Sequence, residues 1–257
     1  MLRSILAFEA KYHLKSMVFW LSGVLFFVLS FGAATTDSVQ IGGAIGAVNR
    51  NSPYVIMQFT LVMTVIASFV VVAFVAGAVL RDQEQGTAGM LFTTPMRKRD
   101  YVLGRVLGAF LVACGIMAFV LAAVFIGSLM PWLDPERVGP FIPGAYAYSF
   151  FVLALPTLFF MSAVFLGLAT LTRSMMGSYI GLVAFLVGYA IAGTLLADLE
   201  NETLAVMLDP FGVGAFQVAT QYWTTFERYT RILGLVRDIL LNRALWIGIG
   251  GLVLGFT

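Results

Sequence analysis

The sequence predicts an all-α polytopic membrane protein with six transmembrane helices and one further helix at the membrane surface before them. Hydrophobic residues make up 60% of the 257-residue chain and charged residues only 11%, a composition that excludes soluble globular and disordered proteins. The apolar residues gather in six long stretches without a charged side chain. About 20 apolar residues in a helix match the thickness of a bilayer, so each stretch predicts a membrane span.

The chain begins with an amphipathic segment, residues 2–15, in which Leu2, Ile5, Leu6 and Tyr12 share one helical face. We predict an interfacial helix at the cytoplasmic headgroups, whose basic side chains reach lipid phosphates. The alternative is a plain extension of the first span. His13, the single histidine, has no partner at metal-ligand spacing, so we expect a residue at the membrane surface.

The six predicted spans are 17–35, 55–80, 106–130, 144–172, 175–197 and 244–257. Basic residues decide their orientation, because cytoplasmic loops are enriched in Lys and Arg. A cytoplasmic N-terminus puts nine of them inside and two in the short outer loops: Arg3, Lys11, Lys15, Arg81, Arg97, Lys98, Arg99, Arg105 and Arg173 against Arg50 and Arg137. The loops 36–54, 131–143 and 198–243 are therefore predicted to lie outside.

Smaller features complete this outline. The first span is too long for a signal peptide and lacks a cleavage site, so we expect it in the mature protein. Cys114 lies inside the third span and is expected to be a small packing residue. Prolines in 131–143 predict turns, and 198–243 predicts short helices at the outer surface. The sixth stretch holds about 14 apolar residues, which is short for a crossing, so we expect the natural polypeptide to continue.

The loop 81–105 between the second and third spans is the most structured polar segment. Thr87 after Gly86 can cap a helix of one to two turns, Thr87 to Phe92 or Thr93, and Pro95 ends it. A short helix held between two spans can push on both, which a transmission element requires. The alternative is an ordinary basic connector.

This loop resembles that of the permease subunits of type-2 ABC exporters. The resemblance rests on Glu84, Gly86, Thr87, Leu91, Pro95, Tyr101, Gly104 and Arg105, and on Phe8, Glu9, Lys11 and Lys15 in the leading segment. It implies a coupling helix over 84–95, including Phe92, that docks on a cytoplasmic ABC ATPase, with the interfacial helix bracing it. It also implies a second permease half, as a homodimer or a fused pseudo-dimer, and a place in the bacterial inner membrane. Some similar halves are fused to a zinc aminopeptidase domain.

The same resemblance places ATP and Mg on the partner and no cofactor in this chain. The sequence contains neither an H-E-x-x-H motif nor a G-x-x-x-x-G-K-[ST] loop, so we predict no peptidase or ATPase activity here. A net charge of +2 does not point to nucleic acid. The uncharged spans disfavour an ion-coupled carrier and an intramembrane enzyme. The remaining alternative is a non-transporting membrane scaffold, and the Phe- and Met-rich spans suit an apolar cargo or simply lipid contact.

Overall fold

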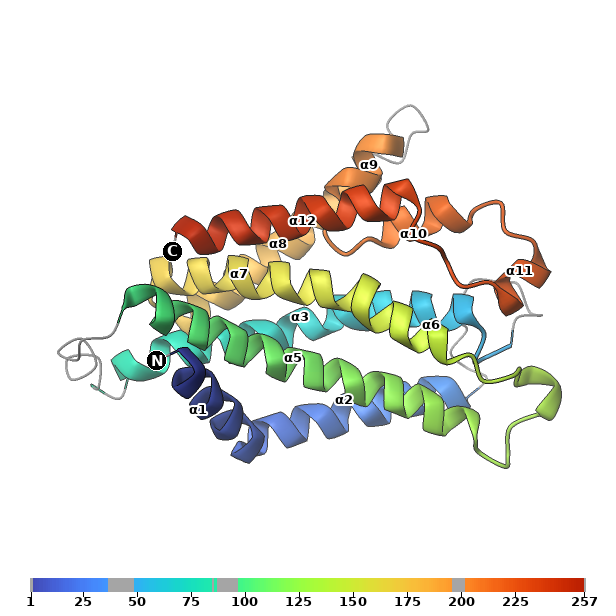
Figure 1. Ribbon diagram of the computed structural model, residues 1–257, viewed down its shortest axis with the longest axis horizontal. Helices are drawn as coiled ribbons and strands as arrows, with labels where there is room; N and C mark the ends of the chain where they lie inside the picture. The colour runs from blue at the N-terminus through green and yellow to red at the C-terminus, as the bar shows by residue number, and fades with distance from the viewer. Residues whose placement is uncertain (1, 37–48, 85, 87–96, 196–201, 257) are drawn as a thin grey trace.

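The computed structural model describes residues 2–36, 49–84, 86, 97–195 and 202–256, and these residues form helices and connecting turns without a strand (Figure 1). Among the described residues, six helical runs are long and apolar enough to cross a membrane, which confirms the predicted architecture. They are α2 (Met17–Thr35), α3 (Pro53–Glu84), α5 (Lys98–Ser128), the continuous run of α6 (Pro143–Tyr148), η2 (Ser149–Ala154) and α7 (Leu155–Thr172), α8 (Met175–Leu195), and α12 (Arg237–Phe256).

The predicted interfacial segment is a helix, α1 (Leu2–Lys15), and its bounds are those predicted. It turns at Ser16 into α2 and packs along α5. The segment before α12 contains three short helices, α9 (Glu202–Leu208), α10 (Val213–Thr220) and α11 (Thr225–Thr230), and η1 (Pro135–Arg137) follows α5. In Figure 1, α10 and α11 lie at the end of the bundle opposite α1.

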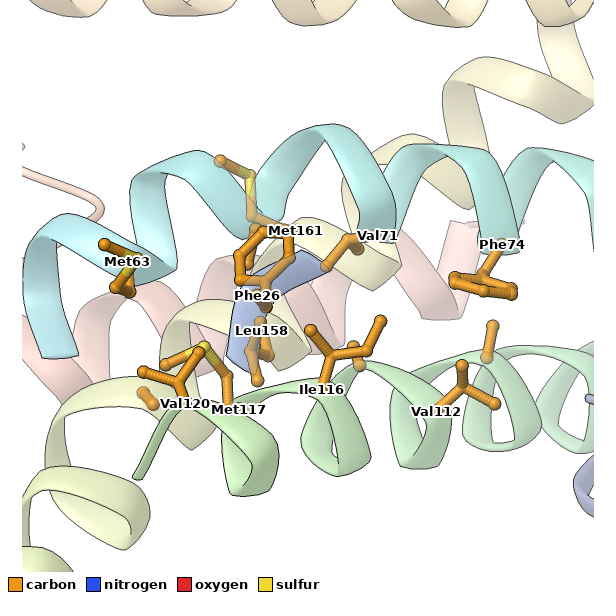
Figure 2. Close-up of a cluster of buried hydrophobic side chains, with 14 of the residues drawn as sticks. Phe26, Met63, Val71, Phe74, Val112, Ile116, Met117, Val120, Leu158 and Met161 are labelled. Atoms are coloured by element: carbon orange, nitrogen blue, oxygen red, sulfur yellow. The ribbon is translucent and has the colours of Figure 1, made fainter. Parts of the chain in front are cut away.

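The core of the bundle forms where α3 packs against α5 and α7. Figure 2 shows buried side chains from α3 and α5 facing one another, with Phe26 of α2 and Leu158 and Met161 of α7 between them. Apolar burial of this kind is dense and continuous. By contrast α2, α8 and α12 carry many exposed apolar side chains, which suits contact with lipid.

The run of 143–172 contains a π-helical turn, η2, that the apolar pattern did not predict. The N–H of Leu155 bonds the carbonyl of Phe150, five residues back. Pro156 follows directly, and a proline inside a helix has no N–H and clashes with the carbonyl four residues before it. The π turn relieves this conflict by shifting the hydrogen-bond register.

Three of the helices extend past the predicted spans and include a buried arginine. Arg81 belongs to α3, Arg105 to α5 and Arg243 to α12, and all three are buried. The predicted boundaries stopped at these charges because a charge in a membrane is costly. The sixth span therefore begins at Arg237, seven residues before the predicted 244, and its 20 residues are long enough to cross. The 14 apolar residues counted from the sequence therefore understate the length of this helix.

Candidate functional site between α1, α3 and α5

The described residues contain a buried charged cluster at the junction of α1, α3 and α5. Glu9 of α1 is its centre and is completely buried. Its Oε1 accepts a hydrogen bond from Nη2 of Arg81 at 2.5 Å and another from Nη1 of Arg105. Charge-assisted hydrogen bonds of this type are about twice as strong as neutral ones. One carboxylate thus holds two arginines from two different spans.

Aromatic rings enclose this cluster. The guanidinium of Arg81 lies 4.0 Å from the ring centroid of Tyr12, and that of Arg105 lies 5.2 Å from the ring centroid of Tyr101. A cation over an aromatic face is attracted by the ring quadrupole, and more strongly where water is excluded. His13 is also buried, with Nε2 at 3.4 Å from Oε2 of Glu9. These rings keep water away from the ion pairs.

The local sequence explains how a carboxylate reaches this position. Glu9 and His13 are four residues apart, so they lie on one face of α1, and this face turns toward the bundle. Gly108 makes the close approach of α1 to α5 feasible, because a Cβ built at this glycine would overlap the Cβ of Glu9. The opposite face of α1 presents Lys11 and Lys15 to the outside.

The cluster connects the two helices that flank the predicted coupling segment. Arg81 lies in the last turn of α3, and Arg105 lies in the third turn of α5. The chain between these helices is the loop in which the sequence predicts the coupling helix. Removing one partner from a buried ion pair costs about 3–5 kcal/mol, so a displacement of either helix end is resisted by α1 and by the other helix.

The structure describes only some of the predicted coupling residues. Glu84 closes α3 in its backbone, and Gly86 is exposed with a left-handed φ of 67°, a conformation that glycine adopts without strain. Tyr101 is half-buried and Gly104 is buried in α5. The others, and with them the predicted short helix, lie outside the described residues: Thr87, Leu91, Phe92 and Pro95.

One expectation for the leading helix needs correction. The prediction that His13 lies at the membrane surface is wrong, because only 4% of it is exposed, between Glu9, Tyr12 and the ring of Phe74. The buried face of α1 also carries Glu9, which the sequence did not predict. A carboxylate can lie on the buried face because two arginines neutralise it.

Sequence reasoning missed Arg81, His13 and Gly108 as parts of one site. Arg81 was counted only among the basic residues that orient the chain, and Arg105 was assigned to the coupling loop by resemblance but was not paired with Glu9. A signal was available, because Glu9 is the single acidic residue of 2–15 and has a histidine four residues later. The pairing of Glu9 with arginines distant in the sequence follows only from the arrangement of the helices.

Comparison with known proteins gives a family match that spans this cluster. The model of the family described as ABC-2 family transporter protein matches residues 3–211. All residues of the Glu9 cluster and the whole predicted coupling loop fall within this range. No match was found among curated proteins.

Proposed function

Because the chain belongs to the ABC-2 transporter family, and is therefore a membrane permease component of an ABC transporter, we propose that it serves an exporter driven by a separate cytoplasmic ATPase. The Glu9 cluster supports this proposal independently of the family match. It ties the interfacial helix to both ends of the loop predicted to meet the ATPase. A force on that loop would act on α1, α3 and α5 together.

In the proposed mechanism, residues 84–95 form the coupling helix and bind the ATPase. Closure of two ATPase copies on ATP moves this helix. The motion enters α3 and α5, whose ends cannot separate freely because Glu9 holds Arg81 and Arg105. The spans then move between arrangements with different access, as in other rigid-body transitions. A cargo shifts this equilibrium only by its difference in affinity for the two arrangements.

The proposal includes the partners that this mechanism needs. A second permease half, identical or fused, would complete the substrate path, and ATP with Mg would be bound by the ATPase and not by this chain, to which we assign no enzymatic activity. We place the protein in the bacterial inner membrane. The exposed Lys11 and Lys15 would bind lipid phosphates there while the opposite face of α1 holds the cluster.

Copurification tests the coupling role. The full chain is expressed with its ATPase, and the bound ATPase is quantified for Glu84→Ala and for a chain in which 87–92 is replaced by Gly and Ser. Both variants should lose most of the ATPase. Glu136→Ala is the matched control, because this exposed glutamate lies in η1 at the opposite end of the bundle. Unchanged binding in both variants would overturn the proposed docking site.

Vesicle transport tests the direction and the energy source. In inside-out vesicles an exporter accumulates cargo in the lumen when ATP is added outside, and a fluorescent amphipathic probe reports this uptake. Uptake should require both ATP and the ATPase. Uptake driven by an ion gradient alone would contradict the proposal and support a secondary carrier, and ATPase binding without any uptake would support a scaffold.

A further inference from the structure

The linker between α11 and α12, residues 231–236, exposes apolar side chains at the end of the bundle opposite α1, which the sequence predicts to lie outside (Figure 1). Leu235 is 61% exposed and Val236 is 41% exposed. The linker is fixed to the bundle just before them, because the hydroxyl of Tyr148 in α6 donates to the carbonyl of Gly234 at 3.2 Å. The two apolar side chains are therefore held at the surface by a contact of their own segment.

The exposed apolar surface continues from the linker onto α12. Arg237 begins α12, and Leu240 and Leu241 lie three and four residues later, so these side chains share one helical face. All three are exposed, whereas Ile239 and Asn242 are buried on the other side of the helix. Large apolar side chains continue the exposed face along the span: Leu245, Ile247 and Leu252. We call the outer end of this surface the outer strip, formed by Leu235, Val236, Arg237, Leu240 and Leu241.

The length of α12 indicates the depth of the outer strip. Its 20 residues rise about 30 Å at about 1.5 Å each, which matches the hydrocarbon thickness of a bilayer. A span of this length places Arg237, its first residue, at the outer boundary of the hydrocarbon. The linker before it is irregular, and lipid-exposed irregular backbone does not occur within the hydrocarbon, because its peptide groups would be unsatisfied there. The outer strip therefore lies at the level of the lipid headgroups.

The composition of the outer strip suits contact with phospholipids. Its leucine and valine side chains can lie against the upper acyl chains while a guanidinium reaches the phosphates. Arg237 is exposed, and it has no ion-pair partner among the described residues. Arg231 in the same segment, by contrast, pairs with Glu227 at 2.6 Å. Arg237 is thus available to a lipid phosphate, which a guanidinium binds through paired, charge-assisted hydrogen bonds.

We propose that the outer strip binds anionic phospholipids of the outer leaflet, with Arg237 on the phosphate and the apolar side chains on the acyl chains. Its continuity with the lipid-facing side of α12, its depth and its charge all favour lipid over a protein partner. The contact anchors the start of α12, because interfacial arginines help to set the tilt and rotation of a span. The inference depends only on a membrane location, and not on ATP-driven export.

Spin labelling of the full chain in nanodiscs tests the depth of the outer strip. In a Cys114→Ala background, a nitroxide is attached to Leu235→Cys, and its collision rates with oxygen, which concentrates in lipid, and with a water-soluble nickel chelate are compared. Glu136→Cys in η1 gives the reference for water, and Ile247→Cys in the middle of α12 gives the reference for lipid, because both native side chains are exposed. The ratio of oxygen to nickel collisions at 235 should lie between the two references. A ratio equal to either reference would overturn the proposed level.

Lipid quenching tests the role of Arg237. A bimane group on Leu240→Cys lies one turn from Arg237, and brominated phosphatidylglycerol or brominated phosphatidylcholine is added to the bilayer as the quencher. One arginine at the surface should enrich an anionic headgroup about fivefold, so the anionic lipid should quench at about one-fifth of the concentration that the zwitterionic lipid requires. Arg237→Gln should abolish this preference, and Arg237→Lys should keep most of it. Arg231→Gln is the matched control, because this exposed arginine pairs with Glu227, and it should leave the preference unchanged.

The outcomes separate a lipid-binding surface from the alternatives. Equal quenching by the two lipids in the chain that keeps Arg237, or a preference that survives Arg237→Gln, would refute the binding of anionic lipid by this arginine. Slow collisions with both reagents at 235, together with spin–spin broadening between labelled chains, would show that a second copy of the chain covers the outer strip, and this result would also refute the proposal. Neither experiment contains an ATPase, so a failure of the proposed export function would leave both results unchanged.

Discussion

Replacing Glu9 by Gln tests the cluster with almost no change in shape. The amide keeps one oxygen to accept a hydrogen bond, but it removes the negative charge that faces both arginines. Arg81 and Arg105 are 9% and 5% exposed, so neither guanidinium has free access to water. The substitution therefore removes the carboxylate that these two buried cations share.

The expected cost follows from this burial. Removing one partner from a buried ion pair destabilises a protein by about 3–5 kcal/mol, because the remaining charge stays uncompensated. Glu9 contacts two arginines, so we expect the upper part of that range. The stacking of Arg81 on Tyr12 and of Arg105 on Tyr101 remains in the variant, since these contacts do not involve Glu9. We therefore expect loosening of α1 and of the flanking helix ends, with the bundle core intact.

Equilibrium unfolding in mixed micelles measures this cost, and limited proteolysis reports whether α1 detaches. Glu227→Gln is the control, because Glu227 pairs with Arg231 at the exposed surface of α11, where ion pairs contribute little. The triple variant Glu9→Leu, Arg81→Met, Arg105→Met removes every charge of the pair set and should recover most of the stability. A loss below about 1 kcal/mol for Glu9→Gln would refute the assignment of Glu9 as the buried counter-charge.

Three further changes have outcomes that the structure determines. Gly108→Ala should lower the free energy of unfolding by about 1–3 kcal/mol, because the added methyl group overlaps Glu9. Gly248→Ala in α12 is the control, since the space there is open and the change should stabilise by about 0.5–1 kcal/mol. Equal effects of the two changes in the same unfolding assay would contradict the close approach of α1 to α5. Arg173→Gly should raise stability by up to about 1 kcal/mol, because exposed Arg173 ends α7 with a φ of 49°; a destabilised variant would show that its side chain matters more than its backbone. Hydrogen bonds from Thr224 and Arg231 lower the pKa of Glu227, so the α11 capping box should be stable above the ordinary glutamate pKa and be lost as pH falls through the lowered value. Trp223 fluorescence against pH, in a chain whose other tryptophans are replaced, should show a midpoint below the usual range, and Glu227→Gln should abolish the transition.

The sequence was sufficient for the spans because their signal is local. A helix must satisfy its own backbone in lipid and expose apolar side chains along its length, so α2 could be placed to the residue. Errors occurred where a charge ended an apolar stretch. Arg243 was assigned to an outer loop because a charge within a span is costly. Its cost is offset by Leu153 and Thr157, about 90 positions earlier in the chain, which no local pattern contains.

The part of the Glu9 cluster that depends on local sequence could also be predicted. Glu9 and Arg105 were singled out by resemblance, and the pattern of the leading helix correctly gave its bounds. Their direct contact was not predicted, since it depends on how closely α1 crosses α5 at Gly108. The sequence alone favoured solvent for a carboxylate and a histidine in an amphipathic helix. The packing reverses this preference by bringing two cations to one face.

The two buried charge sites, at Glu9 and at Arg243, lie at opposite ends of the bundle. At Glu9 the counter-charge is present, so breaking the contact is costly and the ends of α3 and α5 move as one unit. At Arg243 the Asp209 carboxylate supplies an electrostatic counter-charge, and hydrogen bonds to Leu153 and Thr157 hold α12 to the fourth span. The helices between them are in continuous contact, because α3 packs on α7 and α7 packs on α12. A displacement that enters α3 and α5 at the Glu9 cluster is therefore expected to reach α12 through α7.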